Sequence, residues 1–148
     1  MYKSAVNHFE IIMPKLLKGN SHEDSRGTLM YNNDFDARAI KRIYLIENKS
    51  TDIVRAWQGH KIEQRWFSAI IGSFKIELIA IADWNRPCKK AERFEFELDS
   101  KKLDILHIPA GYVSSIQSLE EGAKLLVMAD FALGELEDDY RYEPDYFE

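Results

Sequence analysis

Two short polar clusters contain the residue types that could do chemistry in this chain. The first runs from Arg55 to Gln64 and includes Gln58 and His60, and the second places Ser114 three residues after the glycine of a Pro-x-Gly turn. Only the imidazole of His60 can exchange a proton near neutral pH, so these clusters indicate a general base. One imidazole with two amides and a hydroxyl is a poor ligand set for a divalent cation. We therefore predict no metal and no cofactor here.

Strand alternation predicts which of these side chains share a cavity. In an extended strand, Gln58 and His60 point to one side, whereas Arg55 and Trp57 point to the other. If the phase continues past the following turn, Trp66 joins Gln58 and His60 inside a barrel. A polar patch inside a barrel predicts a polar ligand. The alternative is that His60 is a hydrogen-bonded core histidine that bridges strands.

The central part of the chain has the pattern of short β-strands. Apolar and β-branched runs bounded by turn residues predict strands at residues 40–46, 54–60, 66–71, 74–81, 93–98, 103–108 and 125–129. Gly72 and Ser73 predict a tight hairpin turn. Strands of this number without helical periodicity predict an all-β jelly roll.

The two ends of the chain differ from this central part. Residues 1–17 predict an appended segment or a strand, followed by one domain over residues 18–148. The stretch from Gly19 to Gly27 has the composition of a loop. The acidic stretch from Gly134 to Tyr142, with its interleaved tyrosines, predicts a solvated tail or a short helix.

Composition and charge exclude several classes of protein. A chain of 148 residues with 45% hydrophobic residues suits one compact, ordered domain. One cysteine and no positively charged apolar leader predict a cytoplasmic protein. No apolar run approaches the ~20 residues of a membrane span. A net charge of -5 argues against nucleic acid and anionic membranes as partners, although it permits a local basic pocket.

Five motifs, taken in their order and spacing, resemble the RmlC-like nucleotide-sugar cupins. They are residues 24–27, 55–61, the turn at 72, residues 108–112 and residues 139–141. This group contains the dTDP-4-dehydrorhamnose 3,5-epimerases and the WxcM-like sugar 3,4-ketoisomerases, and the resemblance implies a cupin double-stranded β-helix. The spacing is closest to the ketoisomerases, because their Arg-Gly-x-His-Ala-His-Lys segment aligns without a gap from Arg55 to Lys61.

Three arginines are candidates for substrate binding, and two of them stand at positions that the resemblance implies. Arg26 takes the place of an arginine that a neighbouring subunit contributes to the substrate diphosphate in the epimerases, although a surface arginine is the alternative. Arg55 takes the place of the arginine before the histidine motif, whereas Arg65 lies where a lysine or glutamine is usual. The guanidinium fork suits phosphate and carbonyl oxygens, because it makes two charge-assisted hydrogen bonds.

The resemblance also places the histidine motif. Gln58 occupies the position of the usual catalytic histidine, whereas His60 retains the second histidine. An amide cannot take a proton from a carbon beside a ketone at neutral pH. Further substrate-binding candidates are Gln64, Ser114 and Trp66, the last of which could stack on a ring or pack in the core.

Two functions follow from the resemblance. The first is a metal-independent isomerase or epimerase that removes a proton beside the ketone of a dTDP-4-keto-6-deoxyhexose. His60 would be the base and Tyr140 the acid, with Tyr112 and Tyr142 as alternatives for the acid. The second function is a cupin that binds a sugar nucleotide or carbohydrate without turnover, which the replacements at Gln58 and Ser114 favour. The resemblance further implies a homodimer formed through exchange or pairing of the N-terminal strand.

Overall fold

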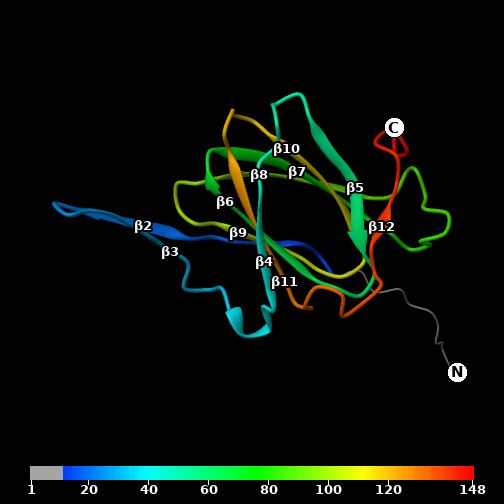
Figure 1. Cartoon of the computed structure of the whole chain (residues 1–148), viewed down its shortest axis with the longest axis horizontal. Coiled ribbons are helices and arrows are strands. Elements are labelled where there is room, and N and C mark those ends of the chain that lie inside the picture. Colours follow the sequence, from blue (N-terminus) through cyan, green and yellow to red (C-terminus); the bar gives the residue numbers. More distant parts are fainter. Residues whose placement is uncertain (1–11) are drawn as a thin grey trace, which may run out of the picture.

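Two antiparallel five-stranded sheets face each other and form a barrel (Figure 1). The computed structural model describes residues 12–148. The first sheet has the order β1 (Lys15–Leu17), β9 (Ile105–Ile108), β6 (Arg65–Ile71), β11 (Lys124–Ala129) and β4 (Arg42–Ile46). The second sheet has the order β12 (Tyr140–Arg141), β5 (Val54–His60), β10 (Tyr112–Ser118), β7 (Ser73–Ala80) and β8 (Arg93–Asp99).

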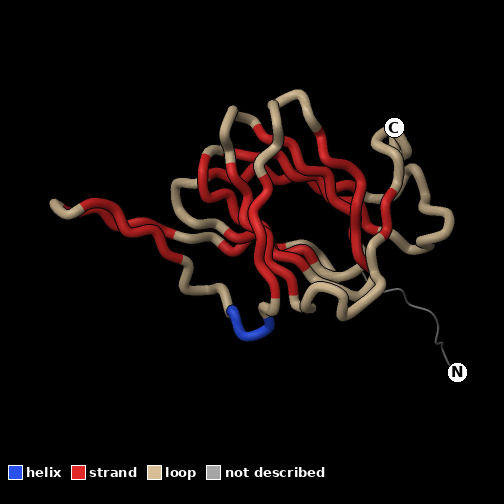
Figure 2. Tube along the Cα trace, in the orientation of Figure 1, coloured by secondary structure: helices blue, strands red, loops and turns tan. Residues whose placement is uncertain are grey.

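The remaining elements lie outside these sheets. A two-stranded hairpin of β2 (Asn20–Asp24) and β3 (Gly27–Tyr31) projects from the barrel, as Figure 2 shows. The only helical turn in residues 12–148 is the 3-10 turn η1 (Ala37–Ala39), and no helix there is long and apolar enough to cross a membrane. The predicted all-β jelly roll is therefore confirmed.

Side chains from the facing surfaces of the two sheets form the core. Phe74, Ile76 and Leu78 of β7 are completely buried and pack against Leu125 and Val127 of β11. Burial of one such side chain contributes about 1.5–3 kcal/mol, so this apolar contact holds the two sheets together. Residues 1–11 of the predicted N-terminal segment lie outside the described residues, and β1 pairs with β9 at the edge of the first sheet.

The prediction of a loop from Gly19 to Gly27 is wrong, because β2 occupies most of this stretch. Asn20 pairs with Tyr31 and Asp24 pairs with Gly27 across the hairpin. Every residue of β2 is exposed. A strand that buries neither face has no apolar alternation, and therefore its composition is that of a loop.

The prediction of a solvated tail or short helix at the C-terminus is also wrong. β12 pairs with β5, so that Tyr140 lies opposite Gly59. Asp138 and Phe147 are both 4% exposed, and Phe147 packs edge-on against Trp57 at 5.4 Å. Buried aromatic area outweighs the acidic character of this segment.

A β-bulge in β5 changes the predicted strand phase. Gln58 pairs with Ser114 and Arg55 pairs with Ile116, so two residues of β5 lie opposite Ser115 alone. An extra residue on one strand reverses the side to which the following residues point. Arg55 therefore faces the same cavity as Gln58, although simple alternation predicts the opposite side.

The predicted phase of β6 is also wrong. Arg65 and Phe67 face the inside of the barrel, where they line a cavity. Trp66 instead packs with Ile105 and Met128 in a separate cluster. The turn between β5 and β6 shifts the alternation by one residue, which reverses every side chain of the second strand.

Gly59 is required where β5 and β10 approach each other. A Cβ atom at this position would lie 2.6 Å from the Cα of Val113 and would collide with the carbonyl oxygen of Tyr112. We predict that Gly59→Ala lowers the free energy of unfolding by about 3 kcal/mol, because backbone cannot move aside as a side chain can. Urea denaturation followed by tryptophan fluorescence measures this loss.

Gly122→Ala is the matched control for this substitution. Gly122 has a φ of +76°, and a Cβ atom added there would meet no neighbour within 4 Å, so it tests backbone strain alone. The expected loss is about 1–2 kcal/mol. A loss for Gly59→Ala no larger than this would contradict the close approach of β5 and β10.

Candidate functional site

A cavity of about 730 Å³ opens between the two sheets. This volume lies within the range of about 300–1,000 Å³ that is usual for sites of small-molecule ligands. β4, β5, β6 and β10 contribute side chains to its wall, and the segment before and after β12 completes it. The cavity therefore collects residues that lie far apart in the sequence.

His60 lies at the end of β5 in the wall of this cavity and is partly buried. Its Nδ1 is 2.8 Å from the backbone carbonyl oxygen of Asp138. A carbonyl oxygen can only accept, so Nδ1 carries the proton and Nε2 holds the free lone pair. Burial, followed by the positive charge of Arg65, lowers the pKa of His60 below 6.5. At neutral pH the imidazole is therefore a neutral base.

Arg65 connects a carboxylate and a phenol beside His60. Its Nε donates to Glu63 at 2.6 Å, and its Nη1 donates to the hydroxyl oxygen of Tyr44 at 2.7 Å. Only 11% of each side chain of the Arg65–Glu63 pair is exposed. Since the oxygen of Tyr44 accepts from Arg65, its own proton remains available to another acceptor in the cavity.

Two further arginines give the cavity a local positive charge. Arg55 donates from Nε to Oδ1 of Asn48 at 2.9 Å, and Asn48 is 5% exposed. The guanidinium of Arg42 lies 4.6 Å from the centre of the Tyr44 ring. Within residues 12–148, neither Arg42 nor Arg55 has a carboxylate partner. Both can therefore bind an anion from outside the chain.

Gln58 and Ser114 line the same cavity as paired neighbours on β5 and β10. Gln58 donates from Nε2 to Asp139 at 2.8 Å, and the hydroxyl of Ser114 donates to the backbone carbonyl of Gln58 at 3.4 Å. Together with His60, Arg55 and Arg65, they are the predicted site residues that the structure brings together.

The other predicted site residues contact structural partners away from the cavity wall. Oε1 of Gln64 lies 2.7 Å from Nε2 of His107 and accepts a hydrogen bond from its N–H, because an amide oxygen can only accept. Trp66 stacks on His107 at 4.9 Å. Tyr140 packs on Trp84, and Arg26 pairs with Asp24 at the tip of the β2–β3 hairpin. Their roles in substrate binding or catalysis stay predictions.

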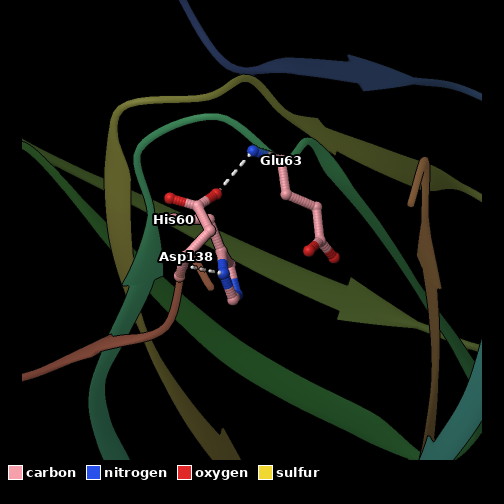
Figure 3. A group of neighbouring side chains, drawn as sticks. All are labelled: His60, Glu63 and Asp138. Atoms are coloured by element: carbon pink, nitrogen blue, oxygen red, sulfur yellow. Dashed lines mark hydrogen bonds between the residues drawn. The ribbon is translucent and has the colours of Figure 1, made fainter. Parts of the chain in front are cut away.

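His60, Glu63 and Asp138 place potential ligand atoms within 4.8 Å of one another (Figure 3). The carboxylate of Asp138 accepts three backbone N–H groups of the β5–β6 turn at 2.8–2.9 Å, and Glu63 is paired with Arg65. The proton on Nδ1 of His60 also occupies one imidazole nitrogen. Because these atoms already form hydrogen bonds or an ion pair, the group stabilises the turn and is a poor ligand set for a cation.

Sequence reasoning missed four residues of this site, namely Arg42, Tyr44, Glu63 and Asp138. The alternation in β4 is misleading, because the apolar Ile43 and Leu45 are exposed whereas Arg42 and Tyr44 line the cavity. A phase with the apolar residues inward would have placed Arg42 and Tyr44 outside. No pattern marks Asp138 either, which lies in an acidic run.

Comparison with protein families decides the relationship. Residues 12–148 match the family described as WxcM-like, C-terminal. The chain belongs to this family. The resemblance seen in the sequence is thereby confirmed, and the jelly roll is a cupin. No curated protein matches the WxcM-like chain.

Solved structures similar to this WxcM-like chain include a sugar 3,4-ketoisomerase from Thermoanaerobacterium thermosaccharolyticum in complex with TDP. The two chains are 29% identical, with a TM-score of 0.67, and the match covers 90% of this chain and 91% of the other. A TDP-quinovose 3,4-ketoisomerase from Campylobacter jejuni is 22% identical over 93% and 98% of the chains, with a TM-score of 0.65.

A third similar structure is a 3'-monoepimerase from Streptomyces bikiniensis in complex with dTDP-quinovose. It is 12% identical over 88% and 70% of the chains, with a TM-score of 0.71. At this identity, and at that of the Campylobacter protein, the likeness concerns the fold alone. The WxcM-like chain is thus a cupin similar to nucleotide-sugar isomerases and epimerases.

The surroundings of His60 lead to a prediction about its pKa. Since Arg65 lowers this pKa and Glu63 raises it, Arg65→Gln removes the lowering charge and leaves Glu63 without its partner. We expect the pKa of His60 to rise in this variant. Titration of the imidazole by NMR measures the shift, and Arg38→Gln, at an exposed pair with Asp36, is the control.

The lowered pKa of His60 also determines in which direction its contribution to stability changes with pH. The folded-state pKa of His60 lies below the unfolded value of about 6.5. Between the two values the unfolded chain binds more protons, so the contribution of His60 to the free energy of unfolding falls as pH drops through that window. A pKa of His60 at or above 6.5 in the wild type would contradict the buried, neutral imidazole.

Proposed function

We propose that this chain is a nucleotide-sugar isomerase that moves a proton beside the ketone of a dTDP-4-keto-6-deoxyhexose. The observation that carries the proposal is His60, because its Nδ1 proton is bound by Asp138 while Nε2 keeps a lone pair. Such an imidazole is a competent general base near neutral pH. The carboxylates around it that could bind a metal are already hydrogen-bonded or ion-paired, so the proposed reaction proceeds without a metal.

Arg42 and Arg55 support a diphosphate as the anionic part of the substrate. Both line the cavity, and both lack a carboxylate partner in the described part of the chain. The Thermoanaerobacterium ketoisomerase has been crystallised with TDP, and a histidine-to-asparagine variant of it with TDP-4-keto-6-deoxyglucose. That variant is 26% identical to this chain, which supports a related ligand here.

The proposed reaction uses His60 and Tyr44. Nε2 of His60 removes the proton from the carbon beside the ketone, and the C–H electrons form an enediol double bond while the carbonyl oxygen gains negative charge. The hydroxyl of Tyr44 donates its proton toward that oxygen, and the charge of Arg65 stabilises the anion. The imidazolium then returns the proton to the former carbonyl carbon. The hydroxyl on the carbon that His60 deprotonated loses its proton to Tyr44 and becomes the new ketone, which completes the ketone shift.

Tyr44 replaces Tyr140 as the proposed acid for a geometric reason. A proton donor must come within hydrogen-bond reach of the reacting oxygen. Tyr44 lines the cavity, whereas Tyr140 packs on Trp84 and does not. Tyr112 also lines the cavity, but its hydroxyl donates to the carbonyl of Ile12, and burial raises its pKa to about 12.

The second candidate function is binding of the sugar nucleotide without turnover. It is favoured by Gln58 and Ser114, because an amide and a hydroxyl line the cavity where the family resemblance implies histidines. Both side chains can hold a sugar hydroxyl, but neither can act as a base at neutral pH.

We further propose that the chain forms a homodimer in which the hairpin of one subunit reaches the cavity of the other. The β2–β3 hairpin is almost wholly exposed, and an isolated hairpin is marginally stable in water. Leu29 on the hairpin and Ile43 and Leu45 on β4 are exposed by 53–64%. A second copy of the chain would bury these side chains and bring Arg26 to a shared site. A cytoplasmic location stays a prediction.

Proton exchange tests the isomerase directly. Incubation of the wild type with TDP-4-keto-6-deoxyglucose in deuterated water should place deuterium on the carbons beside the ketone. His60→Asn should lower the exchange rate by about a hundredfold or more. Mass spectrometry and NMR of the recovered sugar measure the label, and calorimetry with TDP checks that the variant retains its ligand site. Tight TDP binding by a wild type that exchanges nothing would favour the binding function.

Complementation between variants tests the shared site. Arg26→Glu and His60→Asn should each be inactive alone, whereas a mixture should recover about a quarter of the wild-type sites, because half of the dimers are mixed and each has one intact site. Mixing His60→Asn with Tyr44→Phe is the control, since both changes lie in the same chain's cavity and no mixed dimer has an intact site. Absence of recovery, despite mixed dimers seen by native mass spectrometry, would refute the role of Arg26.

A further inference from the structure

Asp138 contacts the site through two different groups. Its side chain is buried within the turn between β5 and β6, where Oδ1 accepts from the backbone N–H of Lys61 at 2.9 Å. Oδ2 accepts from the N–H groups of Ile62 and Glu63 at 2.9 and 2.8 Å. Its backbone carbonyl accepts from Nδ1 of His60 at 2.8 Å, and Figure 3 shows the imidazole beside this residue.

We infer that Asp138 is a positioning residue that fixes the tautomer of His60. Three charge-assisted hydrogen bonds hold the carboxylate against the turn that follows His60, and therefore they hold the carbonyl of the same residue at hydrogen-bond distance from Nδ1. Nδ1 must then carry the proton, which leaves Nε2 as the basic nitrogen. This inference deepens the proposed function, on which its catalytic consequence rests.

The position of Asp138 in the chain adds a reason for this role. Asp138 lies two residues before Tyr140, where β12 begins its pairing with β5. The C-terminal segment is anchored beyond that point by Trp57, whose main chain exchanges hydrogen bonds of 2.9 and 3.1 Å with Tyr142. The carbonyl that orients His60 is thus held from both sides, by the turn through its own carboxylate and by the sheet through β12. Preorganisation of this kind avoids reorientation during the reaction.

His107 provides an internal reference with the opposite tautomer. Its Nε2 is 2.7 Å from Oε1 of Gln64, while Nε2 of Gln64 donates to Asp130 at 3.2 Å. The amide oxygen therefore accepts from His107, so Nε2 of His107 carries the proton. Two partly buried histidines in one chain should show opposite protonation patterns, and only that of His60 should depend on Asp138.

Nitrogen-15 NMR of the whole chain tests the inference without substrate. At a pH above both histidine pKa values, we expect His60 to be protonated at Nδ1 and His107 at Nε2, with the His60 signals assigned by their loss in His60→Asn. In Asp138→Asn an amide N–H faces the turn in place of an acceptor oxygen. The Nδ1-protonated population of His60 should fall, while His107 stays unchanged and Glu137→Gln, at the preceding residue, has no effect.

The outcomes separate this inference from the proposed function. An Nε2-protonated His60 in the wild type would overturn the inference whatever the variants do, and so would a folded Asp138→Asn chain with an unchanged His60 tautomer. If the wild type exchanges substrate protons, Asp138→Asn should lower the exchange rate by about tenfold or more while leaving the affinity for TDP unchanged. If the wild type exchanges none, the proposed function fails while the tautomer result still decides the role of Asp138.

Discussion

The antiparallel pairing of β5 with β10 is the contact on which the site depends. It places Gln58 opposite Ser114 and His60 opposite Tyr112, so that polar side chains from two distant segments line one cavity. The close backbone approach at Gly59 permits this pairing, and the bulge beside Ser115 rotates Arg55 onto the same side. A regular ladder of the same sequence would leave Arg55 on the wrong face, with a base but no adjacent cation in β5.

Three arginines line the cavity, although the chain as a whole is acidic. The net charge is -5, yet Arg42, Arg55 and Arg65 all line the cavity. Glu63 neutralises Arg65 at 2.6 Å, which leaves Arg42 and Arg55 as the cations open to an anionic ligand. Burial of His60, followed by the charge of Arg65, lowers the pKa of its imidazole. The cavity thus combines cations that are open to an anionic ligand with a neutral imidazole.

Much of this fold could be predicted from the sequence, whereas part of the site could not. Strands with apolar runs, such as those that contain Phe74 or Val127, are evident because their inward residues are buried by the opposite sheet. β2 was missed because it buries nothing within its own barrel. The prediction that Arg55 points away from Gln58 failed because a bulge adds one residue, and the sequence carries no mark of where a ladder slips.

The contribution of Asp138 could not be predicted for another reason. The role inferred for it depends on contacts with residues 61–63, which lie 75–77 positions earlier, and not on its own neighbours in an acidic run. Sequence reasoning assigns a carboxylate in such a run to the solvent, because an unpaired buried charge is costly. Three backbone N–H groups offset that cost here. Such a residue can be recognised only from the three-dimensional structure, in which its hydrogen bonds to the turn are present.

The replacement of histidine by glutamine at position 58 has a different meaning once the geometry is known. Gln58 donates to Asp139 and presents its amide to the cavity, where it can bind a ligand but cannot accept a proton from carbon. His60, on the same side of β5, has a hydrogen-bond acceptor for its Nδ1 proton, and burial, followed by the charge of Arg65, lowers its pKa. Loss of an imidazole at position 58 therefore removes a potential metal ligand and one base, while the requirements for proton transfer are met two residues later. In the proposed reaction, the substrate would therefore place its reacting carbon beside position 60.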